Sequence, residues 1–256
     1  QGAAMASGIS IIVGFLSMHG YLQFKATIFH LSRFVFSIKD CWDMLYNGSS
    51  EFIGQLSMSF TNFLFNAVIL KVAGINGIAA LTLVGYSGYL FDMITTGFGQ
   101  GISPLISYSF GAGDKSLCHI IRKQTLKMVL TVALIFYAVL TLTAPAYSRL
   151  FTSDPMVGHY TITGLRLFTL SFSFMGYNML HSFFFTAIGN AKASAIISAA
   201  RGLVIVSLAV LILPLFLGLT GIWLVAPVTE AITTCIAWYF VRQMLQLDMR
   251  NAFLVP

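Results

Sequence analysis

Charged residues are scarce in this sequence. Asp, Glu, Lys and Arg make up 9% of its 256 residues, whereas a soluble domain carries roughly 25%. So few charged side chains cannot cover a water-exposed surface, and this excludes an ordinary soluble domain. Hydrophobic residues reach 57%, and the mean hydropathy is +0.86. The composition therefore predicts an integral membrane protein.

Catalytic and metal-binding motifs are lacking as well. The three cysteines (Cys41, Cys118 and Cys235) lie far apart without metal-ligand spacing, and the five histidines are scattered. No GxSxG, HExxH or P-loop motif occurs. An intramembrane aspartyl protease needs two Asp on facing helices, and Asp92 has no evident Asp partner. We expect a protein that is not an enzyme and uses no cofactor.

The sequence does contain apolar runs near the length of about 20 residues that a membrane-spanning helix needs. They lie at 51–73, 78–109, 125–147, 160–187, 195–217 and 221–242, and the run at 2–22 resembles the end of a further span. Residues 23–50 mix charged and apolar side chains at helical spacing, as in an amphipathic helix on a membrane surface. Residues 243–256 follow the last apolar run and form a tail. The pattern predicts an all-α, polytopic membrane protein, and the opening inside an apolar run indicates a piece of a longer chain.

The distribution of Lys and Arg predicts the orientation. Alternate loops hold most of these residues: Lys25, Arg33, Lys39, Lys115, Arg122, Lys123, Lys127, Lys192, Arg201, Arg242 and Arg250. The opposite loops hold only Lys71, Arg149 and, at a helix start, Arg166. Since cytoplasmic loops carry the excess of basic residues, we expect the first set and the C-terminus to be cytoplasmic, in the cell membrane. Anionic lipid beside this face accounts for the net charge of +6 without nucleic acid.

Polar side chains form a stripe on the span at 51–73. At about 100° per residue its members fall within an arc of roughly 80°; they are Glu51, Gln55, Ser59, Asn62 and Asn66. Such a stripe lines a cleft or makes interhelical hydrogen bonds. Glu51 also follows Asn47-Gly48-Ser49-Ser50, so it has a second interpretation as a first-turn acid beside a helix cap.

Two more carboxylates fall at membrane depth, where charge is costly and usually functional. Asp92 shares a helix face with Tyr89, Thr96 and Gln100. Two interpretations of this face are open: it lines a water-filled cleft, or Asp92 makes a hydrogen bond between packed helices. Glu230 lies mid-span, where burial favours the neutral acid. It is interpreted either as a proton-coupling group or as a protonated acid in one interhelical hydrogen bond.

In the span at 160–187, Tyr177 and His181 share a face with Arg166. A buried histidine is more often a satisfied core residue than a relay, and both interpretations stay open. Arg166 lies near the outer end of the span and is expected to extend toward the membrane surface.

Several stretches together resemble the multidrug and toxic compound extrusion (MATE) family. They are 74-GINGIAALTLVGYSGYL-90, 98-FGQGISPLISYSFGAGDKS-116, 150-LFTSDPMVGHY-160, 183-FFFTAIGNAKAS-194 and 213-LPLFLGLTGIWLVAPVTE-230. The matches run in the family's order from about residue 47 to 242. The opening NGSSEF is most similar to the bacterial multidrug-type members.

The resemblance implies a twelve-helix protein with two six-helix lobes. Residues 1–22 would end helix 6, 23–50 would be the cytoplasmic interlobe linker, 51–242 the C-terminal lobe and 243–256 the cytoplasmic tail. The implied activity is export of amphipathic organic cations, drugs or metabolites in exchange for H⁺ or Na⁺ by alternating access. The implied partners are the substrate, the lipid bilayer and the N-terminal lobe.

The resemblance also implies a substrate and cation cleft. Its expected lining consists of the polar residues already introduced: Glu51, Gln55, Asn62, Asn66, Tyr89, Asp92, Thr96, Gln100, Tyr177, His181 and Glu230. One departure matters. The position where many relatives carry a cation-binding Glu on helix 7 is Met58 here, and helix 10 lacks the acid that some relatives use. Coupling then falls to Glu51, Asp92 or Glu230, or to the other lobe.

Two further hypotheses remain. One is a flippase of lipid-linked oligosaccharides from the same superfamily, whose members tend to carry more basic residues in the cleft. The other is a membrane scaffold that transports nothing, whose polar stripes would tolerate apolar replacement. The acidic character of Asp92 and Glu230 favours the exporter.

Overall fold

The computed structural model describes residues 2–24 and 37–252, except for some side chains within these ranges. Helix α1 (Gly2–Phe24) belongs to a unit that ends at Asp43, and the chain from Met44 onward forms a second unit. Residues 25–36 of the expected surface linker lie outside the described residues, and the described chain resumes at Ser37 with α2 beginning at Ile38. The regular elements of the described ranges are helical throughout, which confirms the all-α class.

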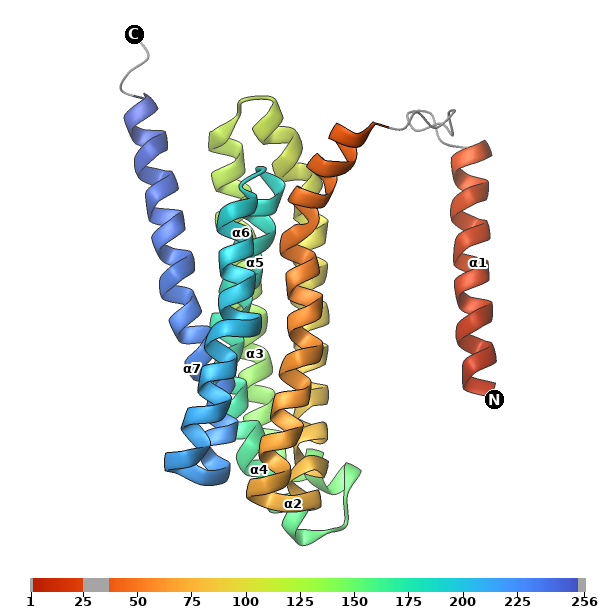
Figure 1. The fold of residues 1–256 in the computed structure, drawn as a ribbon, viewed down its shortest axis with the longest axis vertical. Helices are drawn as coiled ribbons and strands as arrows, with labels where there is room; N and C mark the ends of the chain where they lie inside the picture. The colour runs from red at the N-terminus through yellow and green to blue at the C-terminus, as the bar shows by residue number, and fades with distance from the viewer. Residues whose placement is uncertain (1, 25–36, 253–256) are drawn as a thin grey trace. The chain divides into compact units, whose positions relative to one another are not determined.

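The second unit is a bundle of helices that run up and down (Figure 1). Its elements are α2 (Ile38–Gly111) from Met44 onward, α3 (Lys115–Phe151), α4 (Pro155–Phe168), a 3₁₀ turn (Thr169–Ser171), α5 (Phe172–Ala187), α6 (Ala191–Ala199), a π turn (Ala200–Val204) and α7 (Ile205–Ala252). The backbone leaves the helical conformation at Gly74 in α2 and at Gly218 in α7, where each helix reverses direction (Figure 1). The predicted spans 51–73, 78–109, 125–147 and 221–242 each fall within one of these segments. The span 160–187 runs through α4, the 3₁₀ turn and α5, and the span 195–217 runs through α6, the π turn and the first part of α7.

The turns between helices explain two of the motifs quoted from the sequence. In FGAGDKS, Gly113 takes a positive φ of 79° and the Asp114 carboxylate accepts the Leu117 N–H at 2.9 Å, which caps α3. In FTSDPM, Asp154 accepts the N–H groups of Met156 and Val157 at 2.7 and 3.1 Å, with Pro155 at the first position of α4. These motifs end one span and begin the next.

The exterior of the bundle is apolar. Leu142, Leu215 and Phe216 are 81%, 80% and 82% exposed, which is favourable against lipid rather than water. By length and composition, four helices of the described residues can cross a membrane: Met5–Phe24, Ser59–Gly111, Lys115–Phe151 and Ala191–Gln246. The second and fourth contain 53 and 56 residues and turn back at Gly74 and Gly218, so each provides two passes. The chain is a polytopic membrane protein.

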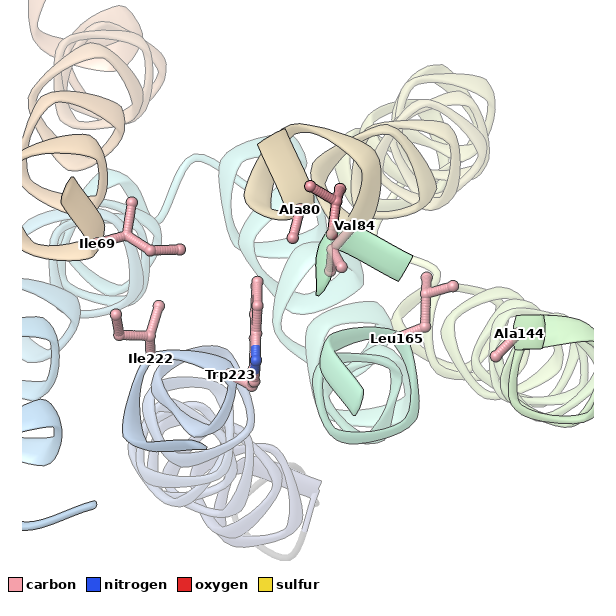
Figure 2. Close-up of a cluster of buried hydrophobic side chains, with 8 residues drawn as sticks. Ile69, Ala80, Val84, Ala144, Leu165, Ile222 and Trp223 are labelled. Carbon is pink, nitrogen blue, oxygen red and sulfur yellow. The ribbon is translucent and has the colours of Figure 1, made fainter. Parts of the chain in front are cut away.

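One buried apolar cluster holds the bundle together near the Gly74 and Gly218 reversals. It comprises Ile69, Ala80, Val84, Ala144, Val157, Leu165, Ile222 and Trp223. Figure 2 shows the indole of Trp223 extending from α7 into the middle of this cluster. Gly164 of α4 permits the close packing, because a Cβ there would lie 2.8 Å from Val84 Cγ2 and 3.0 Å from the indole. The cluster thereby packs α2, α4 and α7 against one another.

Candidate functional site

A network of polar side chains lies inside the second unit; we call Asp92, Asn178, Arg201 and Glu230 the charge cluster. Arg201 donates to Glu230 Oε1 from Nε at 3.0 Å and from Nη2 at 2.8 Å. Asn178 donates from Nδ2 to Glu230 Oε2 at 2.7 Å and to the Glu230 carbonyl at 2.9 Å. Glu230 is only 7% exposed, and both its carboxylate oxygens have donors. Full satisfaction of this kind is what a buried charge requires.

The π turn Ala200–Val204 places Arg201 in this network. Such a turn inserts one residue into a helix and leaves the regular ladder of backbone bonds incomplete, and it occurs frequently at functional sites. Thr61 of α2 compensates by donating its hydroxyl to the Gly202 carbonyl at 2.8 Å. Gly202 also packs closely, since a Cβ there would lie 2.9 Å from Ser57 Cβ. The first segment of α2 is therefore joined to the turn that carries Arg201.

Asp92 completes the charge cluster from the second segment of α2. It is half-buried and lies within electrostatic range of Arg201. On the opposite side, the Thr234 hydroxyl donates to Asn178 Oδ1 at 3.1 Å, which directs the amide nitrogen of Asn178 toward Glu230. The cluster thus contains two carboxylates and one guanidinium. With both acids ionised it carries one excess negative charge, which a proton, a metal cation or an organic cation would neutralise.

His181 belongs to a second polar group. It is fully buried, and its ring lies 4.1 Å from that of Tyr177, as the shared helix face predicts. Arg122 Nη1 lies 3.1 Å from His181 Nε2, and His181 Nδ1 lies 2.7 Å from the Tyr177 carbonyl. Because a guanidinium only donates, Nε2 accepts and Nδ1 carries the hydrogen, so the ring is neutral. These contacts favour the interpretation of His181 as a satisfied core residue.

The other predicted cleft residues lie along α2, nearer the surface of the unit. Asn62 and Asn66 are exposed, and Asn66 Nδ2 donates to the Asn62 carbonyl at 2.8 Å. Tyr89 is 56% exposed, Gln100 is exposed and Thr96 is half-buried. The side chains of Glu51, Gln55 and Met58 lie outside those that the structure describes. Arg166 is exposed, in agreement with its expected position near the end of a span.

Sequence reasoning missed the partners of Glu230. Both interpretations of this residue assumed a neutral acid, whereas the structure pairs it with Arg201. Arg201 was assigned to a basic loop, yet it lies in the π turn inside the bundle. The eleven Lys and Arg residues that predicted the cytoplasmic side are therefore reduced by one. The available signal was the position of Arg201 within the apolar run 195–217, where an unpaired charge is costly. Asn178 and Arg122 gave no comparable signal.

The chain has relatives among known proteins. The MatE family model matches residues 52–211, which is more than half of the chain. "Multidrug export protein MepA" of Staphylococcus saprophyticus is 27% identical over 255 residues, covering 96% of this chain and 55% of that protein. The protein of the same name from Staphylococcus haemolyticus is 29% identical over 164 residues, covering 61% and 35%. The chain spans about half the length of the curated relatives it matches.

Solved structures share the fold. A structure described as the outward-facing conformation of a multidrug resistance MATE family transporter superposes with a TM-score of 0.89, at 23% identity and over 97% of this chain and 57% of that one. A transporter of the MOP superfamily from Pyrococcus furiosus, whose description refers to a binding pocket of reverse polarity, gives 0.88 at 24% identity, over 96% and 56%. Taken with the family match, the arrangement of helices places this chain in the MatE family, the MATE transporters.

Proposed function

We propose that this chain is the C-terminal half of a cation-coupled antiporter that exports amphipathic organic cations, drugs or metabolites by alternating access. The observation that carries the proposal is the excess of one carboxylate in the charge cluster. A cluster with more carboxylates than guanidinium groups can bind either the coupling cation or a cationic substrate, and competition between the two is the basis of exchange. The names of the MepA relatives, which are multidrug export proteins, agree with it.

Asp92 is the group that we propose exchanges the cation. Glu230 already receives donors on both oxygens, from Arg201 and Asn178, so its charge is compensated inside the protein. Asp92 is half-buried, and its charge acts on the same guanidinium. Protonation or Na⁺ binding at Asp92 would make the cluster neutral, while release would restore the negative charge that attracts the organic cation.

The polar residues on the exposed side of α2 would line the route to this group. Tyr89 offers an aromatic face for a lipophilic cation, and Asn62, Asn66, Thr96 and Gln100 offer hydrogen-bonding groups. On this proposal the N-terminal lobe supplies the opposite wall of the cleft. The protein would lie in the cell membrane with its basic loops and C-terminus in the cytoplasm.

The test is gradient-driven efflux of a fluorescent organic cation from cells that produce the full-length protein. We expect Asp92→Asn to reach the membrane at normal abundance but to lose most efflux under both proton and sodium gradients. Asp154→Asn is the matched control, because it also exchanges an acid for its amide while an asparagine still caps α4. Undiminished efflux by Asp92→Asn would show that Asp92 is not the coupling site and that this site lies in the other lobe.

The flippase hypothesis has one observation in its favour. Arg122 is a partly buried cation whose contacts are with His181, Tyr177 and Phe184, and among the described residues no carboxylate pairs with it. The exporter is preferred because Glu230 neutralises Arg201 and the remaining charge of the cluster is negative. Transfer of a lipid-linked oligosaccharide in reconstituted vesicles, without efflux of organic cations, would reverse this preference.

A further inference from the structure

The first pass of α2, the part before Gly74, is bonded to the π turn Ala200–Val204. The Thr61 hydroxyl donates to the Gly202 carbonyl at 2.8 Å, across a sequence separation of 141 residues. Ser57 lies four residues before Thr61 on the same face of the pass, and a Cβ at Gly202 would lie 2.9 Å from Ser57 Cβ. One face of the first pass therefore lies directly against the turn.

The π turn needs such a donor because of its backbone bonds. The Ile205 N–H donates to the Ala200 carbonyl, five residues earlier instead of four. This pattern shifts the ladder by one residue, so a carbonyl of the turn loses its usual backbone donor. Inside a membrane water cannot readily replace that donor. By giving the turn a donor, Thr61 favours the π geometry over a regular helix.

The direction of Arg201 depends on this geometry, because the residue lies inside the turn. All three of its guanidinium nitrogens have partners: Nε and Nη2 donate to Glu230 Oε1, and Nη1 donates to Met179 Sδ. A change of the turn to a regular helix would alter the rotation between its two ends by about 100°, the angle of one residue. The guanidinium cannot keep all three bonds through such a change.

The α6 side of the turn is held in place by hydroxyl groups. Ser182 Oγ of α5 lies 3.1 Å from Ser194 Oγ and 3.0 Å from Ser198 Oγ, and Thr186 Oγ1 lies 2.7 Å from Ser194 Oγ. Hydrogen bonds of this kind hold membrane helices together. Ser198 lies three residues before Arg201. With α6 attached to α5, the contact from α2 acts on the turn itself.

We propose that Thr61 is a positioning residue for the Arg201–Glu230 pair. Its bond to Gly202 maintains the π turn, and the turn directs Arg201 to Glu230. A movement of the first pass that withdraws the Thr61 hydroxyl releases Arg201, and the buried Glu230 then takes up a proton from water rather than keeping an unpaired charge. Thr61 directly precedes the exposed Asn62, so the same pass meets the proposed route to Asp92. The use of this release during transport rests on the proposed function, whereas the placement of Arg201 does not.

The test is the rate at which dicyclohexylcarbodiimide modifies Glu230 in the purified full-length protein in detergent, followed by mass spectrometry of the peptide that contains Glu230. This reagent attacks protonated carboxyl groups in apolar surroundings, and the ion pair with Arg201 protects Glu230 from it. We expect about fivefold faster modification in Thr61→Val, which keeps the shape but donates no hydrogen bond, because the loss of one hydrogen bond shifts a population by about this factor. Thr61→Ser keeps the hydroxyl and should react at the parent's rate.

Thr82→Val is the matched control. It makes the same exchange on α2, but the Thr82 hydroxyl donates to the Ile78 carbonyl of its own helix at 3.0 Å. Glu230 should react at the parent's rate in this variant. The proposal is overturned if Thr61→Val also reacts at the parent's rate, if Thr82→Val accelerates the reaction equally, or if Thr61→Ser reacts as fast as Thr61→Val.

Gly202→Ala tests the contact from its other partner and replaces Thr61→Val should that variant not fold. The new Cβ would crowd Ser57 and displace the first pass, so Glu230 should again react faster, and an unchanged rate would count against the proposal. The readout is the chemistry of Glu230 and not efflux. A failure of the antiporter proposal therefore leaves this inference unaffected, and an unchanged rate in Thr61→Val leaves the antiporter proposal unaffected.

Discussion

Arg201 donates two hydrogen bonds to the same oxygen of Glu230, from Nε at 3.0 Å and from Nη2 at 2.8 Å. The other oxygen, Oε2, is left to Asn178. The two residues come from different helical segments, the π turn after α6 and the last part of α7. The ion pair therefore constrains the rotation of these two segments. It also uses the Arg201 guanidinium to balance the charge of Glu230.

We predict that Arg201→Met destabilises the protein by about 3 kcal/mol or more, because it leaves the buried Glu230 carboxylate without its counter-charge. The double variant Arg201→Met/Glu230→Gln should recover much of this loss, since the unpaired charge is removed as well. The midpoint of thermal unfolding of the purified protein measures both effects.

Arg201→Lys serves as the control for charge. Lysine keeps the positive charge but cannot reproduce the two hydrogen bonds that the guanidinium donates from Nε and Nη2 to Oε1. Its unfolding midpoint should lie between those of the parent and Arg201→Met. If Arg201→Met unfolds at the temperature of the parent, the ion pair contributes nothing to stability.

Asn178 gives a second prediction. Asn178→Ala removes the donor to Glu230 Oε2 and the acceptor of the Thr234 hydroxyl, and we expect a loss of about 0.5–2 kcal/mol, the range for hydrogen bonds between membrane helices. Asn178→Asp should cost more, although it preserves shape, because it adds a third carboxylate to the charge cluster, next to Glu230. Comparison of the two unfolding midpoints decides the order, and the reverse order would contradict the assignment of the amide nitrogen to Glu230.

The sequence predicted the helical segments well because the residues of each span are sufficient to identify it. A run of apolar residues of sufficient length, bounded by a cap such as Asp154-Pro155, requires no knowledge of the neighbouring helices. The proximity of Tyr177 and His181 was also local, since residues four apart share a helix face.

The Arg201–Glu230 pair could not be predicted in this way. Twenty-nine residues separate the partners, and the π turn shifts the register of the helix by one residue, so a regular helical wheel misplaces Arg201. The rule that basic residues gather in cytoplasmic loops then assigned Arg201 to a loop. The pairing depends on how α6 and α7 pack, which periodicity does not encode.

Gly164 provides a prediction about packing. In Gly164→Ala the new Cβ would meet Val84 Cγ2 at 2.8 Å and the Trp223 ring at 3.0 Å, and Val84 and Trp223 are each only 1% exposed. We expect a loss of about 1–3 kcal/mol from overpacking. Gly85→Ala is the matched control, because it is also helical and a Cβ there meets nothing within 4 Å. Its unfolding midpoint should equal or exceed that of the parent, since alanine favours the helix.

Gly74 provides the last prediction and separates backbone strain from crowding. Its φ of 63° and ψ of −155° belong to a region that is nearly exclusive to glycine, yet a Cβ at this position meets nothing within 4 Å. Gly74→Ala should therefore cost about 1–3 kcal/mol through the backbone alone, at the reversal between the two passes of α2. Gly97→Ala, at an open helical position farther along α2, should cost nothing. If both variants unfold at the same temperature, the reversal does not need the glycine conformation, and residues 73–75 must join the two passes with a different backbone geometry.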